Sequence, residues 1–178
     1  MSLAIQLPPR DDQQEFNLRA WERLLADADL AKIPGSFETD RHGHIIMTPP
    51  PGYQHGGRQF EIGYLLRKIL GGNVRTECPL STSDGVKAVD VVWLSDFRES
   101  SALKGNVLIQ APEICVEVLS PTNTPAEMEE KKSLYFDAGA GADEVWFCEE
   151  NGTMRFHSPS GPIQTSQLCP DFPSTIDL

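Results

Sequence analysis

Residues 113–121 read EICVEVLSP and place one carboxylate, Glu117, inside an apolar run. Because side chains of a β-strand alternate between its two faces, Glu117 shares a face with Cys115 and Leu119. Both faces are otherwise apolar, which is typical of an interior strand covered on each side. An ionised carboxylate in such a place is strongly destabilising unless a partner compensates its charge. Glu117 therefore needs a partner.

A second apolar run repeats this feature, because VDVVWL, residues 89–94, carries the single acid Asp90. If the two strands are neighbours and their carboxylates share a face, mutual repulsion raises one pKa unless a cation lies between them. Mg²⁺ binds carboxylates, backbone carbonyls and water. We therefore predict Mg²⁺, or Mn²⁺, held by Asp90, Glu117 and the backbone carbonyl of Val118. Pairing of each acid with an arginine is the alternative.

A helix is predicted after this strand, with Thr124 as its N-cap, Pro125 in its first turn and Gly139 as its stop. Its helical periodicity directs either Lys131 or Lys132 towards the core, so one ammonium group could reach the carboxylates. There it would orient or help to deprotonate a water and neutralise phosphate charge. The alternative is that both lysines form only surface ion pairs with nearby glutamates.

The rest of the sequence predicts further elements. They are an amphipathic helix over 13–30 that docks on the core as a lid, a hairpin over 35–52 with its turn near 41–43, a helix over 55–72 ended by Gly71, strands at 74–78, 89–94 and 114–119, and a hairpin with an Asn151-Gly152 turn. This order indicates an α/β domain with a mixed sheet.

Composition limits the partners and the location. The formal net charge of the 178 residues is −11 at pH 7, so DNA or RNA would be bound only through a local basic strip. No apolar run approaches the roughly 20 residues of a membrane helix, and the first residues lack a signal-peptide pattern, so we expect no membrane partner and a cytoplasmic location. The four cysteines are widely spaced, and we expect buried, reduced thiols.

Four stretches in order resemble the Uma2 family, which is classed with restriction-endonuclease-like, PD-(D/E)xK nuclease folds. They are FETDRHGHIIMTPPPGYQHG (37–56), VDVVWLSD (89–96), APEICVEVLSPTN (111–123) and KKSLYFDAGAGADEVWFC (131–148). The resemblance implies an α/β fold, a restriction-endonuclease-like core with a central mixed β-sheet flanked by helices. We expect one domain over residues 1–178, with an N-terminal helix at about 11–31, a core at about 36–157 and a C-terminal extension at about 158–178.

The resemblance also implies a catalytic set. Asp90 falls on the aspartate of the family's Pro-Asp strand, although Val89 stands where the proline is usual, and Glu117 falls on the second acid. The nuclease pattern places a lysine two residues after that acid, but Leu119 occupies the position here. The resemblance implies that the following helix supplies this lysine instead, as Lys131, four residues before Tyr135.

Other candidates are less specific. Lys132 is the fallback for the helix lysine. His55 opens the second predicted helix and could meet a phosphate or water, Glu61 could supply a helix-borne acid, and Glu38 matches the early acid of the family. Ordinary surface or structural roles are the alternatives for these three.

The resulting functional hypothesis is a metal-dependent endonuclease that hydrolyses phosphodiester bonds, with DNA as its substrate. The resemblance makes a homodimer plausible. Two other classes stay open, namely a binding or regulatory module that retains the nuclease fold without catalysis, and a hydrolase of small phosphorylated molecules, which would tolerate the acidic charge better.

Overall fold

The computed structural model describes residues 12–48 and 50–178. Its elements in chain order are α1 (Gln13–Ala26), η1 (Leu30–Lys32), β1 (Ser36–Thr39), β2 (Ile45–Thr48), α2 (Tyr53–Leu70), β3 (Asn73–Thr82), β4 (Gly85–Leu94), α3 (Asp96–Ala102), β5 (Leu103–Lys104), β6 (Val107–Leu108), β7 (Ile114–Val118), α4 (Pro125–Asp137), β8 (Glu144–Cys148), β9 (Met154–Ser158) and β10 (Gly161–Ile163).

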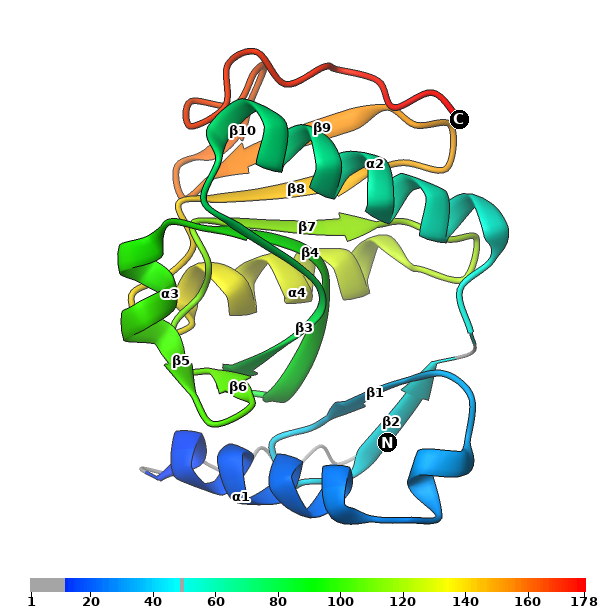
Figure 1. Ribbon diagram of the computed structural model, residues 1–178, viewed down its shortest axis with the longest axis vertical. Helices are drawn as coiled ribbons and strands as arrows, with labels where there is room; N and C mark the ends of the chain where they lie inside the picture. Colours follow the sequence, from blue (N-terminus) through cyan, green and yellow to red (C-terminus); the bar gives the residue numbers. More distant parts are fainter. Residues whose placement is uncertain (1–11, 49) are drawn as a thin grey trace, which may run out of the picture.

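Eight strands form one sheet in the order β10-β9-β8-β7-β4-β3-β6-β5, and β1 pairs with β2 in a separate hairpin. The large sheet is mixed, because β7–β8 and β3–β6 are parallel while the other pairs are antiparallel. Figure 1 shows α2 in front of this sheet and α4 behind it. The predicted α/β fold with a central mixed sheet flanked by helices is confirmed.

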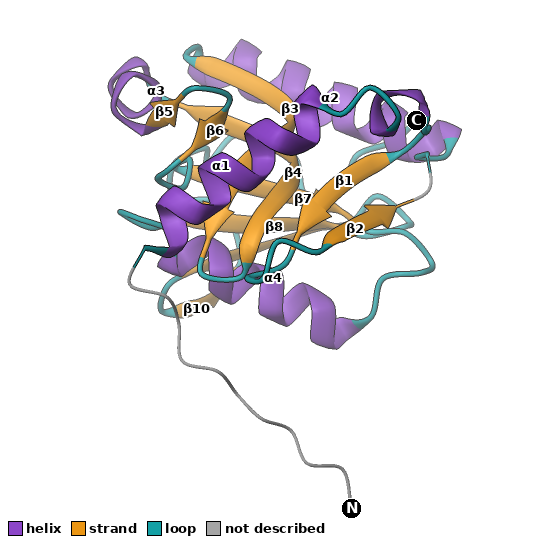
Figure 2. Cartoon of the chain, turned by 90° about the horizontal axis from the view of Figure 1, so that it is seen from below, coloured by secondary structure: helices purple, strands orange, loops and turns teal. Residues whose placement is uncertain are grey.

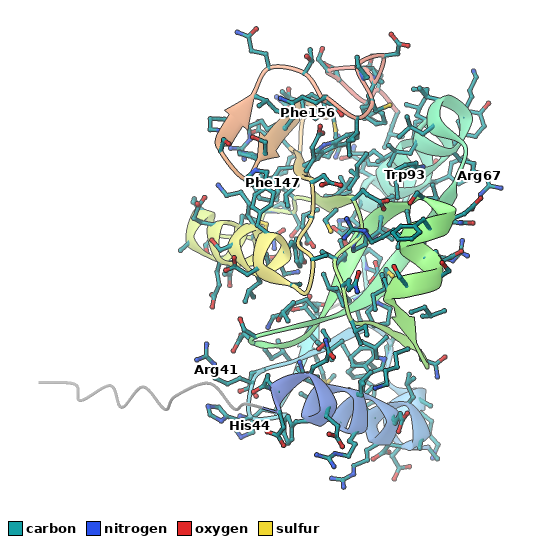
Figure 3. The ribbon with its side chains drawn as sticks, turned by 90° about the vertical axis from the view of Figure 1, so that its left-hand side faces the viewer. Arg41, His44, Arg67, Trp93, Phe147 and Phe156 are labelled. Carbon is teal, nitrogen blue, oxygen red and sulfur yellow. The ribbon has the colours of Figure 1, made fainter. Side chains whose placement is uncertain are left out.

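β7 lies in the interior of the sheet, as its sequence predicts. Val116 and Val118 pack in the core under α2, whereas Cys115 packs in the core under α4. The neighbouring strands follow the same division, since Phe147 lies on the α4 side and Phe156 on the α2 side (Figure 3). Glu117 therefore sits in a strand with apolar packing on both faces.

α4 begins where the sequence predicts. The Thr124 hydroxyl accepts a hydrogen bond from the Glu127 N–H at 3.3 Å, and the Glu127 carboxylate accepts one from the Thr124 N–H at 2.8 Å. This reciprocal capping satisfies two of the free N–H groups at the helix start. The helix ends at Asp137, and Gly139 has a φ of 62°, a conformation that favours glycine. Lys131 is thus fixed in the second turn of a well-defined helix.

α1 docks as a lid on the far end of the β3–β4 hairpin (Figure 2). Trp21 and Leu24 pack against Val86 of β4. The buried Asn17 amide donates hydrogen bonds to the Ser81 hydroxyl at 2.9 Å and to two backbone carbonyls of the hairpin turn. The lid therefore covers the hairpin.

The helix predicted over 13–30 is too long by four residues, because α1 ends at Ala26. The Asp27 carboxylate accepts hydrogen bonds from the N–H groups of Asp29 and Leu30 and so forms a local turn. Aspartate competes for backbone donors in this way and thereby ends helices.

The predicted strand at 74–78 is too short, because β3 continues to Thr82 and forms a hairpin with β4. Pro79 argues against a continuing strand, since proline cannot donate to a ladder. The structure tolerates it because β6 pairs with β3 only at Leu80. Short elements that lack periodicity, namely α3, β5, β6 and β10, were not predicted.

The C-terminal residues pack on the sheet. Phe172 and Ile176 join the core under α2. The buried Glu144 carboxylate accepts hydrogen bonds from the Trp146 indole at 2.6 Å and from the N–H groups of Gln167 and Leu168 at 2.7 and 3.0 Å. Glu144 therefore holds the C-terminal segment against β8.

All four cysteines are buried free thiols, as expected. None of the helices in the described part of the chain combines the length and apolarity that crossing a bilayer requires.

The role of Glu144 predicts a stability effect. Glu144→Ala leaves one buried and two part-buried donors without their acceptor and should lower the free energy of unfolding by about 2–4 kcal/mol. Glu149→Ala, which removes an exposed ion pair with Arg155, should cost less than about 1 kcal/mol. Urea unfolding of both variants measures the difference, and equal losses would contradict the anchoring role.

Candidate functional site

A cavity of about 290 Å³ lies where α2, α4 and the β1–β2 hairpin meet the ends of the central strands. Each neighbouring element contributes an ionisable side chain to its wall. These are Glu38 from β1, His55 from α2, Glu77 from β3, Asp90 from β4, Glu117 from β7 and Lys131 from α4.

Asp90 and Glu117 come from neighbouring antiparallel strands. The register pairs Val91 with Val116, and one further step along it places Asp90 opposite Glu117. The Val118 N–H donates to the Asp90 carboxylate at 2.7 Å. The sequence predicted two neighbouring carboxylates, and the structure brings them to one cavity.

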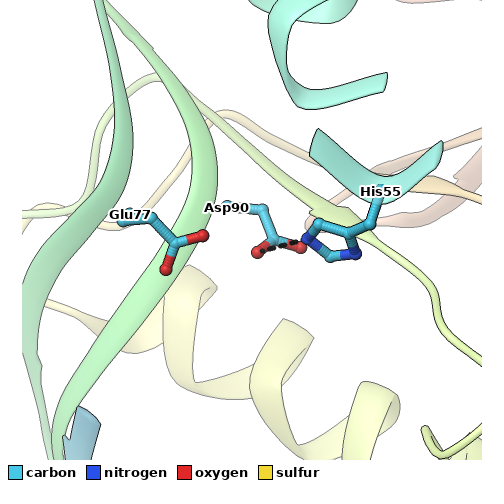
Figure 4. Close-up of side chains that lie close together, drawn as sticks. All are labelled: His55, Glu77 and Asp90. Atoms are coloured by element: carbon cyan, nitrogen blue, oxygen red, sulfur yellow. Dashed lines mark ion pairs between the residues drawn. The ribbon is translucent and has the colours of Figure 1, made fainter. Parts of the chain in front are cut away.

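A possible metal site lies beside Asp90. One ligand atom each from His55, Glu77 and Asp90 lie within 4.8 Å of one another (Figure 4). The His55 Nε2 is 3.4 Å from an Asp90 oxygen. The Gln59 amide donates to Glu77 at 2.6 Å and to Asp90 at 3.1 Å, which orients both carboxylates.

Glu77 is the member of this group that the sequence did not indicate. Among the described residues it is the one non-glycine residue with positive φ, at 50°. The ladder pairs Thr76 and Cys78 with β4 but skips Glu77, whose carboxylate accepts a hydrogen bond from the Ser36 hydroxyl at 2.7 Å. Such backbone strain clusters at functional sites. The available signal was an acid inside a predicted strand, the feature that identified Asp90 and Glu117.

Glu117 is compensated from α4. The Lys131 Nζ lies 3.1 Å from a Glu117 oxygen and 2.9 Å from a Glu38 oxygen. The Tyr135 hydroxyl, one turn further along the helix, donates to the other Glu117 oxygen. The lysine that reaches the acids is therefore Lys131.

β1 is held so that Glu38 faces the cavity. The Val86 N–H of β4 donates to the Thr39 hydroxyl at 2.9 Å, and the Ala88 N–H donates to Glu38 at 3.2 Å. Gly85, with a φ of 87°, permits this contact, because a Cβ there would lie 2.2 Å from the Thr39 carbonyl oxygen. The hairpin thus supplies a second carboxylate to Lys131.

Burial dominates the electrostatics of Glu117. It raises the Glu117 pKa to about 8, with Lys131 opposing the shift and Asp90 adding to it. Burial alone would lower the Lys131 pKa, but the fields of Glu117 and Glu38 raise it above its usual value, so the ammonium keeps its charge. The hydrogen bond to Asp90 raises the His55 pKa, against the effect of burial.

The charges and donor atoms fit a divalent cation. Four carboxylates, from Glu38, Glu77, Asp90 and Glu117, line the cavity together with the single ammonium group of Lys131. A divalent cation would offset most of this formal excess of negative charge. Carboxylate oxygens suit Mg²⁺ and Mn²⁺, and an imidazole nitrogen is accepted by many transition metals.

Two of the remaining candidates, Lys132 and Glu61, lie outside the cavity. Lys132 forms a surface ion pair with Glu129 at 2.7 Å. Glu61 is half-buried on α2 and does not line the cavity. Val118 lines it, and its carbonyl stays a predicted ligand.

Comparisons with known proteins agree with this architecture. Residues 28–176 match the Uma2 family, whose description is "Putative restriction endonuclease". A crystal structure from Anabaena variabilis ATCC 29413, described as "a putative nuclease belonging to DUF820", has a similar fold with a TM-score of 0.63 and 16% sequence identity. The match covers 82% of this chain and 91% of that one. No curated protein sequence matches the chain.

The raised pKa of Glu117 predicts a pH effect on stability. A carboxyl whose pKa is higher in the folded state than its usual 4.5 contributes stability that is complete below that value and is lost as pH rises through about 8. Relative to Glu117→Gln, the wild type in EDTA should lose up to about 1.4 kcal/mol per pH unit across this window. Urea unfolding at several pH values tests this, and parallel curves for the two proteins would refute it.

Proposed function

The chain belongs to the Uma2 family, and from that premise we propose that it is a divalent-metal-dependent endonuclease that hydrolyses phosphodiester bonds in DNA. The observation that carries the proposal is the convergence of His55, Glu77 and Asp90 beside the Glu117–Lys131 pair in one cavity. The cavity thus combines three side chains that can bind a metal ion with the ammonium group of Lys131.

Asp90, Glu77 and His55 would hold Mg²⁺ or Mn²⁺, with Glu117 and the Val118 carbonyl as further ligands on the adjacent wall. When bound, the cation supplies Lewis-acid charge to the phosphate and to the attacking water. Gln59 keeps the first two carboxylates oriented through its hydrogen bonds. Support for His55, Glu77 and Asp90 comes from the short distances among their ligand atoms, whereas Glu117 and Val118 are added because they line the same cavity.

Lys131 would act by charge and position. Its raised pKa keeps it protonated, so it donates hydrogen bonds and does not remove a proton from water. Held between Glu38 and Glu117, the ammonium group faces the cavity and would stabilise negative charge that develops on the phosphate. Of the roles considered for this lysine, neutralising phosphate charge and orienting a water are therefore favoured over deprotonating the water.

Removing a site acid should abolish cleavage. In Mg²⁺ or Mn²⁺ the wild type should nick supercoiled plasmid, and EDTA should stop it. Asp90→Asn and Glu117→Gln should each lower the rate at least about 100-fold, because each weakens the site that stabilises transition-state charge. Glu61→Gln, on α2 but outside the cavity, is the matched control and should retain the rate of the wild type.

The two lysines of α4 provide a second comparison in the same assay. Lys131→Ala should also lower the rate about 100-fold or more, whereas Lys132→Ala should change it less than about threefold. Equal effects of the two substitutions, or cleavage that persists in Asp90→Asn, would contradict the assigned site. Hydrolysis of small phosphate esters with intact plasmid would favour the small-molecule alternative.

A further inference from the structure

α2 presents an aromatic stripe to solvent on the side opposite its packed face. Tyr53, Phe60 and Tyr64 are 95%, 70% and 49% exposed, whereas Ile62 and Leu66 are completely buried. At 100° per residue the three aromatic side chains fall on one outer line of the helix. Burial in the core therefore does not account for these rings.

Two of the rings already form a flat surface. Phe60 and Tyr64 are stacked, with centroids 6.4 Å apart and planes inclined by 9°. The Lys68 Nζ lies 5.7 Å from the centroid of the Tyr64 ring, one turn further along. The planar bases of a nucleic acid strand stack on exposed aromatic rings, and a neighbouring cation adds to this attraction.

The charge of α2 is opposite to that of the chain. Arg67 and Lys68 have no carboxylate of the described residues within 4.0 Å, and among the other described lysines and arginines only Arg23, Lys104 and the buried Arg58 share this property. Figure 3 shows Arg67 on the outside of the molecule. Glu61 is the single acid of the helix. α2 therefore has the local basic strip that a chain of net charge −11 needs to bind a polyanion.

The stripe and the cavity meet at the start of α2. Tyr53, the first residue of the stripe, directly follows Gly52, which lines the cavity, while His55 reaches Asp90 from the inner side of the same turn. A strand that lies along the outer face of α2 thus ends at the site at the helix start.

We propose that this aromatic stripe, with Arg67 and Lys68, binds an unpaired stretch of a DNA strand and leads it to the cavity. The proposal deepens the nuclease function and rests on it for the choice of DNA. The strand must be unpaired, because bases inside a duplex stack on one another and do not offer their faces to side chains. The substrate class is then single-stranded DNA, or DNA with an unpaired segment.

Binding without cleavage tests this directly. Fluorescence anisotropy in EDTA compares a labelled oligothymidylate with a duplex of the same length. We expect tighter binding of the single strand. Phe60→Ala and Tyr64→Ala should each weaken it about fivefold or more. Arg67→Ala and Lys68→Ala should each make the affinity for the single strand less dependent on salt concentration, because each removes a cation that can contact a phosphate. Phe97→Ala, which removes an 81% exposed ring on α3, is the matched control and should have no effect.

Four results would overturn the proposal. They are equal affinity for single strand and duplex, equal behaviour of Phe60→Ala and Phe97→Ala, tighter binding of oligouridylate RNA than of DNA, and a wild-type dimer that Phe60→Ala converts to a monomer in sedimentation. The last result would make the stripe a self-association surface. Urea unfolding confirms that each variant is folded.

Failure of the proposed function can be separated from failure of this inference, because the binding assay contains no metal. If the wild type binds the single strand through the stripe but never nicks DNA, the proposed binding surface is supported and the proposed nuclease function is refuted. If the wild type nicks DNA while Phe60→Ala and Tyr64→Ala bind the single strand normally, the nuclease function is supported and the binding surface is refuted.

Discussion

Two carboxylates at facing positions of β4 and β7, the buried Glu117 and the half-buried Asp90, set the requirement that the surrounding structure meets. Glu117 could not stay ionised there without compensation, because burial and the nearby Asp90 both raise its pKa. The compensating groups come from three separate elements. Val118 contributes a backbone N–H, α4 contributes Lys131 and Tyr135, and α2 contributes the ring of His55. The site is thus built by the same contacts that hold the helices against the two faces of the sheet.

The parts of this site that follow a regular period were predictable from the sequence. Alternation in EICVEVLSP placed Glu117 in an interior strand, and helical periodicity with a strong N-cap placed Lys131 or Lys132 near it. The periodicity leaves both lysines open and the family resemblance favours Lys131; the structure brings Lys131 to the acids, because of how α4 lies across the sheet. Glu77 was not predicted, although it is an acid inside a predicted strand, because its neighbours are not an apolar run and the positive φ that marks it is visible only in the structure. The extension of β3 past Pro79 was not predictable either, because it depends on the neighbouring strand β6, which pairs with β3 only at Leu80.

α2 connects the chemistry with a surface. Its inner side supplies His55 and Gln59 to the acids, while Ile62 and Leu66 fix it on the sheet. Its outer side carries the stacked rings of Phe60 and Tyr64 together with Arg67 and Lys68. A strongly acidic chain can approach a polyanion only where its own charge is locally reversed, and this reversal occurs on the helix that borders the cavity. One helix could therefore both complete a metal site and guide a substrate to it.

The central claim is that His55, Glu77 and Asp90 together hold a divalent cation. The most direct test is a crystal soaked in Mn²⁺, with anomalous scattering used to locate the ion. The account predicts one strong peak in the cavity, within about 2.6 Å of ligand atoms from all three residues. A cavity without a peak at a saturating Mn²⁺ concentration, or a peak that lacks contact with Asp90, would contradict it.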